Sequence, residues 1–251
     1  GQRARHGSEP VGVDDVERHV AERRRMRVLE QSPAAQARDL LEVLAGPRAH
    51  EIGLALRLGD PWRYASTLER RMLNSIDALA SMGSVAVASL EPLVLDSPAK
   101  DPSRAFGLGI ALGCVAGRDA LAAAERVAWS LRQNDPESLA QFADALKIVP
   151  HGSVLLAMRT LLADRDPAMR GLAIDVLAFR GLASPEEIGR AALDAPVVAA
   201  KALPWAALAK SPVVNDAVAQ ALASGDPAAT RGAWLAMAYA GHPQMQAVLG
   251  A

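Results

Sequence analysis

Proline recurs along this chain at the start of stretches rich in Ala and Leu. Five prolines follow an aspartate and one follows an alanine, at Asp60-Pro61, Asp101-Pro102, Asp135-Pro136, Asp166-Pro167, Ala195-Pro196 and Asp226-Pro227. These prolines lie 41, 34, 31, 29 and 31 residues apart. An N-cap aspartate accepts hydrogen bonds from the first free backbone N–H groups of a helix, and proline at the first helical position loses no hydrogen bond. We therefore predict a helix start at each pair, in a structural unit that repeats about every 30 residues.

Each repeating unit is predicted to hold two helices. After Gly117, for example, the apolar residues Leu121, Ala124, Val127 and Leu131 fall on one helical face. The predicted helices span residues 101–116, 118–133, 135–149, 153–163, 166–179, 185–193, 197–209, 213–223, 226–240 and 243–249. Glycines at the expected helix ends predict left-handed C-caps, at Gly83, Gly117, Gly181, Gly225 and Gly241.

The composition favours an all-α fold and narrows the kinds of partner. Hydrophobic residues make up 51% of the 251 residues and aromatic residues only 4%, and most of the apolar residues are Ala and Leu. The formal net charge of −1 gives no overall attraction to phosphate backbones or anionic membranes. Because Cys114 is the single cysteine, a disulfide framework and a Cys-rich zinc site are excluded. A lone reduced cysteine and the lack of an export signal predict a cytoplasmic protein.

Two segments carry a recognisable repeat signature. Residues 166–181 read DPAMRGLAIDVLAFRG, and residues 226–241 read DPAATRGAWLAMAYAG with one extra residue before Arg231. Both segments resemble the HEAT-like repeats of bacterial proteins, of the short kind also found in phycobilin lyase subunits, whose pattern is DPxxRxxAxxxLxxxG. The resemblance is partial at Asp101 and Asp135. It implies an αα-superhelix in which the first helix of each pair lies on the convex side and the second helix on the concave side.

The predicted organisation has three parts. Residues 1–13 are expected to be a flexible segment, residues 14–59 to form degenerate N-terminal repeats with helices at 34–44 and 49–58, and residues 60–251 to form one continuous solenoid. Pro204 falls inside a predicted helix, where it must remove a backbone hydrogen bond, so we expect a kink or break there. The adjacent Trp205 could either border a groove at the break or fill it.

No catalytic, cofactor or metal site is predicted. The five histidines are scattered without metal-binding spacing, and the sequence contains neither a phosphate-binding loop nor a nucleophile elbow. Cys114 lies in an apolar helical stretch, which predicts a protonated core thiol. The same stretch holds Gly107, Gly109 and Gly113, but no strand precedes them, so we expect close helix packing and no dinucleotide site.

The leading hypothesis is a non-enzymatic scaffold that binds a protein or peptide along the concave surface formed by the second helices. Polar and aromatic positions on these helices and their turns are the predicted contacts: Arg126, Trp129, Arg132, His151, Arg159, Arg190 and Gln220. A second candidate contact is the cluster Trp62, Arg63 and Tyr64, because these residue types often anchor interfaces. In that cluster the tryptophan could equally be a packing residue.

Two alternatives stay open. An accessory subunit of a larger bacterial assembly is one, because residues 191–251 carry few charges and this end could dock on another protein or on a second copy of the chain. The other is a lyase-like or DNA-glycosylase-like enzyme on a HEAT-like fold, although the scattered aromatics and near-neutral charge do not favour it. Neither nucleic acid nor a membrane is an expected partner.

Overall fold

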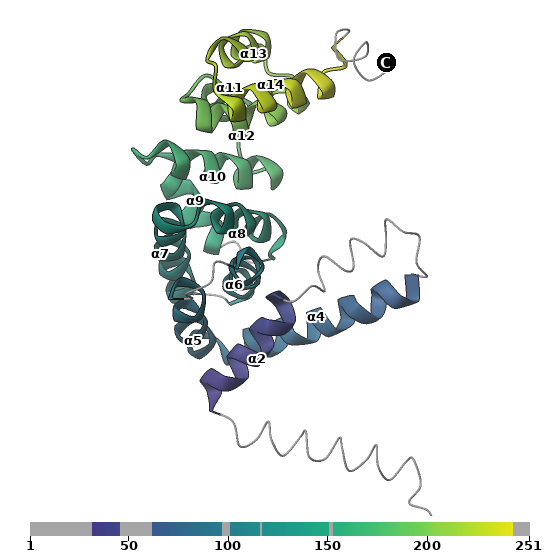
Figure 1. Ribbon diagram of the computed structural model, residues 1–251, viewed down its shortest axis with the longest axis vertical. Coiled ribbons are helices and arrows are strands. Elements are labelled where there is room, and N and C mark those ends of the chain that lie inside the picture. The colour runs from purple at the N-terminus through teal and green to yellow at the C-terminus, as the bar shows by residue number, and fades with distance from the viewer. Residues whose placement is uncertain (1–31, 46–61, 97–100, 116, 151–152, 243–251) are drawn as a thin grey trace, which may run out of the picture.

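The computed structural model describes residues 32–45, 62–96, 101–115, 117–150 and 153–242, and in these ranges the chain forms twelve α-helices and no strand. Figure 1 labels them: α2 (Pro33–Ala45), α4 (Trp62–Met82), α5 (Ser84–Leu95), α6 (Pro102–Cys114), α7 (Arg118–Asn134), α8 (Pro136–Ile148), α9 (Ser153–Leu162), α10 (Pro167–Phe179), α11 (Pro185–Ala192), α12 (Pro196–Leu208), α13 (Val214–Ala223) and α14 (Pro227–Tyr239). The predicted all-α class is confirmed. The helices predicted at 49–58 and 243–249 lie outside the described residues.

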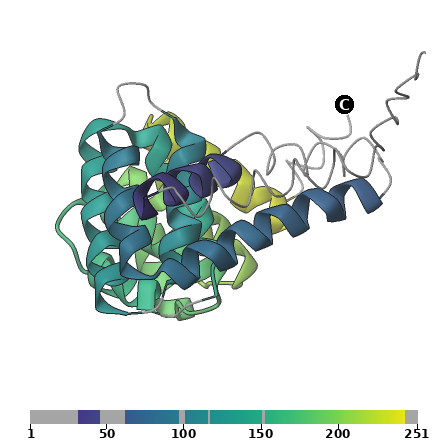
Figure 2. The ribbon, with the colours of Figure 1, turned by 90° about the horizontal axis from the view of Figure 1, so that it is seen from below.

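The helices form two rows. The first row consists of α6, α8, α10, α12 and α14, and each of these helices packs on the next. The second row consists of α5, α7, α9, α11 and α13, and it is continuous from α5 to α9 and again from α11 to α13. Near the N-terminal end, α2 packs against α4, α5 and α6, while the long α4 extends beyond the stack (Figure 2).

Aspartate caps begin four of the five first-row helices, as the Asp-Pro pairs predict. Each carboxylate accepts a hydrogen bond from a backbone N–H of the first turn, at Asp101, Asp135, Asp166 and Asp226. Proline follows each of them at the start of the helix. In α12 the cap is Ala195, which has no side-chain oxygen to offer. Asp60 lies outside the described residues.

The predicted glycine caps divide into two kinds. Gly181, Gly225 and Gly241 have φ values of 65°, 71° and 67° and follow helices, as a left-handed cap requires. Gly83 and Gly117 also have positive φ values, but their ψ values are −131° and 178°, so the predicted left-handed C-caps are wrong at these two positions. Both instead precede a helix, as the N-cap residues of α5 and α7.

Small residues let α6 approach α8 closely. A Cβ atom added to Gly109 would lie 2.6 Å from the Cβ of Ala145, and one added to Gly113 would lie 2.2 Å from the Cβ of Val149. Real Cβ atoms do not approach so closely, so only glycine fits at these two contacts. The close helix packing predicted for this glycine-rich stretch is confirmed.

Of the kink or break predicted at Pro204, the break does not occur, since α12 continues through this residue to Leu208. Pro204 has no N–H to donate to the carbonyl of Ala200, four residues earlier. That carbonyl faces α14, where an added Cβ on Gly232 would lie 2.7 Å from the oxygen. Trp205 packs against the core, and its ring meets that of Phe179 edge to face with centroids 5.9 Å apart. The indole therefore fills space between α10 and α12.

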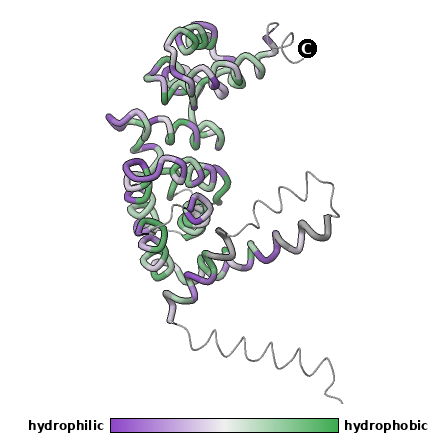
Figure 3. Tube along the Cα trace, in the orientation of Figure 1, coloured by the Kyte–Doolittle hydropathy of each residue, from purple (hydrophilic) through white to green (hydrophobic). Residues whose placement is uncertain are grey.

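The described residues form a hydrophobic core of two clusters. One runs from α2 to α10, and the other runs from Ile174 of α10 to α14. Figure 3 shows hydrophobic residues along both rows, interspersed with hydrophilic ones. Leu162 and Ala183 are partly buried and pack against both clusters. The two clusters therefore meet between α9 and α11.

The glycine contact between α6 and α8 gives a test of the packing. Gly109→Ala should lower the free energy of unfolding in urea by about 1–3 kcal/mol, although alanine is the better helix former, because the new methyl group meets Ala145. The double variant Gly109→Ala/Ala145→Gly removes the methyl group that the new one meets and should recover part of the loss, because the contacts of the new methyl group with Phe142 at 3.2 Å remain. An equally unstable double variant would show that this contact does not set the spacing.

Candidate functional site

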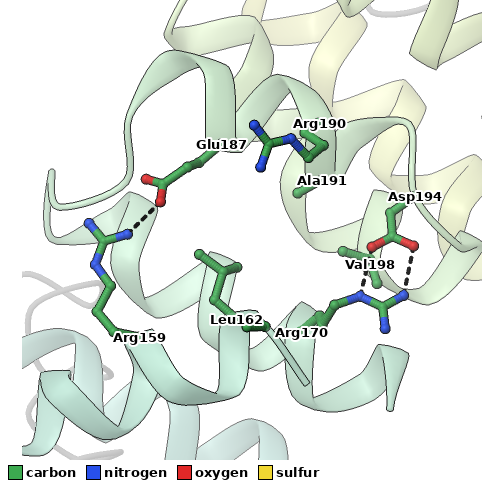
Figure 4. A pocket seen from close by; sticks show the side chains of 9 residues that line it. Arg159, Leu162, Arg170, Glu187, Arg190, Ala191, Asp194 and Val198 are labelled. Atoms are coloured by element: carbon green, nitrogen blue, oxygen red, sulfur yellow. Dashed lines mark hydrogen bonds and ion pairs between the residues drawn. The ribbon is translucent and has the colours of Figure 1, made fainter. Parts of the chain in front are cut away.

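A hollow of about 350 Å³ lies between α9 and α11 (Figure 4), where these two helices do not pack closely on each other. It occurs at the junction of the two core clusters. Three arginines, two carboxylates and four apolar residues line it: Arg159, Arg170, Arg190, Glu187, Asp194, Leu162, Ala163, Ala191 and Val198. The volume is at the lower end of the range typical of ligand pockets.

The apolar part of the hollow comes from three helices. Leu162 ends α9, Ala191 lies near the end of α11, and Val198 lies in the first turn of α12. Ala191 and Val198 are buried, whereas Leu162 is partly exposed and its side chain projects into the hollow (Figure 4). These residues offer an aliphatic contact surface beside the charged groups.

Arg159 bridges the gap between α9 and α11. Its Nη1 donates to Oε1 of Glu187 at 2.7 Å, and its Nη2 donates to the backbone carbonyl of Leu182. The other oxygen of Glu187 accepts from the backbone N–H of Ser184 at 2.8 Å, which is half of a capping box at the start of α11. The Ser184 N–H and then the Arg159 guanidinium lower the pKa of Glu187 below its ordinary value.

Arg170 makes the most extensive polar contact in the hollow. Its Nε and Nη2 donate to the two oxygens of Asp194 at 2.8 and 2.7 Å, a two-bonded pair drawn in Figure 4. Its Nη1 donates to the carbonyls of Asp164 and Arg165 at 3.0 and 2.9 Å. The Arg170 guanidinium therefore lowers the pKa of Asp194, although burial opposes the shift. Through this side chain α10 is tied both to its own preceding turn and to the turn before α12.

Arg190 differs from the other two arginines. It is exposed in the last turn of α11, and its guanidinium forms no hydrogen bond or ion pair with any residue that the structure describes. The positive charge of Arg190 nevertheless helps to lower the pKa of the Glu187 carboxyl group. Three guanidinium groups and two carboxylates leave the hollow with one uncompensated positive charge.

A second hollow, of about 490 Å³, lies farther along the second row between α5 and α7. The predicted contact residue Arg126 lines it and donates to both oxygens of Glu91 at 2.9 and 2.8 Å. Val85 and Ala122 are exposed beside this ion pair. Both of these second-row hollows are thus bordered by an arginine paired with a glutamate of a neighbouring helix.

The other predicted contact residues are placed as follows. Arg132 pairs with Asp166 at 3.4 Å and lines a groove between the first-row helices α8, α10 and α12, so it does not share the hollow of Arg159 and Arg190. Trp129 is partly buried and packs against the core, and Gln220 is exposed on α13. His151 and the side chains of Trp62, Arg63 and Tyr64 lie outside the described residues.

The first-row groove contains a buried carboxylate that is fully engaged. Asp175 accepts from Nε1 of Trp205 at 3.0 Å and pairs with Lys147 at 2.9 Å and Lys201 at 3.9 Å. Burial alone would lower the pKa of Lys147, but the carboxylates of Asp175 and Asp144 raise it. The contacts made by Asp175 connect α8, α10 and α12, so its role is in packing.

Three of the five charged residues that line the α9–α11 hollow were not predicted from the sequence. The predicted contacts include Arg159 and Arg190 but not Arg170, Glu187 or Asp194. The signal for Arg170 was present, because this residue is the arginine of the DPxxR signature. Its partner could not be inferred, since Asp194 is 24 residues away and meets it only through the stacking of α10 and α12.

The described residues offer little support for metal or thiol chemistry. Among them no group of three or more His, Cys, Asp or Glu side chains is placed to hold a metal ion. Cys114 is half-buried and packs against the core, and burial followed by the Asp77 carboxylate raises the pKa of its thiol. In the described ranges no single helix is long and apolar enough to cross a membrane. Residues Glu69–Met82 of α4 and Ser84–Leu95 of α5 are long and apolar enough only together, and they are bent by 113° at the break between them.

No known protein family, curated protein or solved structure matches the chain. The HEAT-like resemblance of residues 166–181 and 226–241 therefore stays a prediction that depends on those residues.

The Arg170–Asp194 pair should make stability depend on pH. Since the pKa of Asp194 is lowered in the folded state, the pair stabilises the fold above the carboxyl pKa of the unfolded chain, and this contribution is lost as the pH falls through the folded-state value. Asp194→Asn should reduce the free energy of unfolding by about 1–2 kcal/mol at pH 7 and flatten its decline between about pH 5 and pH 3. Urea unfolding across this range measures both effects.

Asp77→Asn is the matched control for this prediction, because Asp77 is exposed on α4. This control should leave both the stability at pH 7 and the acid decline close to those of the parent. If Asp194→Asn unfolded with the same stability and pH dependence as the control, the pair of hydrogen bonds from Arg170 to Asp194 would not be what joins α10 to the turn before α12.

Proposed function

We propose that this chain is a non-enzymatic scaffold that binds a protein or peptide along its second-row helices. The observation that carries the proposal is the α9–α11 hollow, where the free guanidinium of Arg190 lies beside an aliphatic surface. The α5–α7 hollow on the same row supports it, since an extended ligand needs more than one point of contact. Stacked helix pairs are well suited to such ligands, because they present long continuous surfaces.

The proposal includes an αα-superhelix of HEAT-like repeats whose concave side is formed by the second row. Two features support this arrangement. Helices of the two rows alternate along the chain, and Asp-Pro caps begin four of the five first-row helices. The signature residue Arg170 also connects consecutive helix pairs, which gives the arginine of the repeat a physical role.

Binding is favoured over catalysis by the chemistry of the hollow. The two carboxylates that line it, Glu187 and Asp194, are held by arginines, and the pKa of each is lowered, so neither is suited to act as a general acid or base near neutral pH. Its other lining residues are arginines and aliphatic side chains, which supply no nucleophile. Positive and apolar groups together suit recognition.

One observation favours the accessory-subunit alternative. The last described helix, α14, exposes three large side chains, with Trp234 at 54%, Leu235 at 44% and Tyr239 at 55% of full exposure. The residues at the position of Trp234 in the two preceding first-row helices, Ile174 of α10 and Leu203 of α12, are buried, and each of those helices packs on a following first-row helix. Docking of α14 against another subunit, including a second copy of the chain, would cover this face and is compatible with ligand binding on the second row.

A blocking experiment tests the location of the binding surface. Exposed alanines allow the same substitution on each row: Ala122→Trp in the α5–α7 hollow, Ala163→Trp in the α9–α11 hollow, and Ala140→Trp on first-row α8 as the matched control. The probe is a phage-displayed library of random 12-residue peptides, selected on the intact chain. We expect enriched peptides to bind at least tenfold more weakly to one or both second-row variants and unchanged to the control.

Two results would contradict the proposal. Either no peptide is enriched above an unrelated helical protein, or the enriched peptides lose affinity only for Ala140→Trp. Circular dichroism and urea unfolding of each variant separate a blocked surface from a damaged fold.

A further inference from the structure

We propose that the α9–α11 hollow holds an acidic segment of the partner polypeptide, with an Asp or Glu carboxylate on the guanidinium of Arg190 and an adjacent aliphatic side chain against Leu162, Ala191 and Val198. This inference depends on the proposed function, because it specifies the chemistry of the ligand. It commits to one kind of occupant, an internal acidic and aliphatic stretch of polypeptide.

The charge balance of the hollow selects a single negative group. Arg159 and Arg170 are each neutralised by a carboxylate at 2.7 Å, while Arg190 has no partner among the described residues. One carboxylate supplied by the ligand would neutralise the remaining positive charge of Arg190. A doubly charged phosphate or a nucleic-acid backbone would place more negative charge beside Glu187 and Asp194 than the remaining arginine can compensate.

The geometry keeps Arg190 available for a ligand. One oxygen of Glu187 is taken by Arg159 and the other by the Ser184 N–H, and both oxygens of Asp194 are taken by Arg170. These bonds also fix the neighbouring side chains, so the hollow is formed before a ligand arrives. A guanidinium can bind both oxygens of a carboxylate at once, which gives direction as well as affinity.

The apolar lining specifies what accompanies the carboxylate. Leu162 projects into the space in front of Arg190 (Figure 4), and none of the described residues that line the hollow is aromatic and able to stack on a base or ring. Leu162 is partly exposed, and a branched aliphatic side chain in contact with it would be removed from water. The expected ligand therefore combines one acidic and one aliphatic residue close together in its sequence.

Variants of Arg190 test this inference. Arg190→Gln removes the charge, Arg190→Lys keeps the charge without the two-bonded geometry, and Arg231→Gln on α14 is a matched control that removes an exposed arginine elsewhere. The probes are the peptides enriched from the random 12-residue library, compared with synthetic versions in which each Asp or Glu is replaced by Asn or Gln. Because Arg190 also lies where a cation stabilises a helix end, unfolding of each variant is measured in parallel.

We expect the enriched peptides to share an acidic residue near a Leu, Ile or Val. Arg190→Gln should weaken their binding about tenfold or more, the effect expected for the loss of a charged hydrogen bond. Arg190→Lys should weaken binding by less, and Arg231→Gln should leave it unchanged. The Asn and Gln versions of the peptides should bind the parent as weakly as the acidic versions bind Arg190→Gln. Affinity should also fall as salt is raised.

The other outcomes separate this inference from the proposed function. Peptides that bind the second row but lack a shared acidic residue, or that bind Arg190→Gln as well as the parent, would overturn the inference and leave the scaffold proposal standing. If no peptide is enriched at all, both are overturned. Selection of peptides whose binding needs only the aliphatic residue would likewise show that Arg190 is not the recognition group.

Discussion

The pairing of Arg170 with Asp194 is the interaction on which the middle of the molecule depends. It occurs where the hydrophobic core divides into two clusters, with few apolar side chains shared between them. On the second row α9 and α11 do not pack closely at this junction, so directional contacts matter more there. Arg170 supplies four donated hydrogen bonds there, two to the carboxylate across the junction and two to its own preceding turn.

The same junction explains why a hollow exists on the second row. The first row stays closely packed from α10 to α12, while α9 and α11 separate and are joined by the ion pair of Arg159 and Glu187. Arg159 and Glu187, which connect the two separated helices, also line the hollow between them. A consequence is that the hollow has fixed walls and one arginine, Arg190, that plays no part in holding them.

Local features of this fold could be predicted from the sequence, and features that depend on stacking could not. Asp-Pro pairs specify helix starts through contacts within three residues, which is why four of the predicted caps are found. Pro204 was expected to kink or break its helix, but α12 continues through it, and the Ala200 carbonyl that proline leaves without its usual donor lies against Gly232 of α14. Likewise, Arg159 was expected to face a partner, and its pairing with Glu187 follows from how α9 and α11 are placed.

Arginine side-chain NMR of the intact chain would test the central claim most directly, namely that Arg190 is the free group in a hollow whose other arginines are held. Without a ligand, the account predicts slow guanidinium rotation for Arg170 and Arg159 and fast rotation for Arg190. Adding an enriched acidic peptide should slow Arg190 and leave the other two unchanged. Slow rotation of Arg190 without a ligand, or loss of the Arg170 and Arg159 restraints when peptide binds, would contradict it.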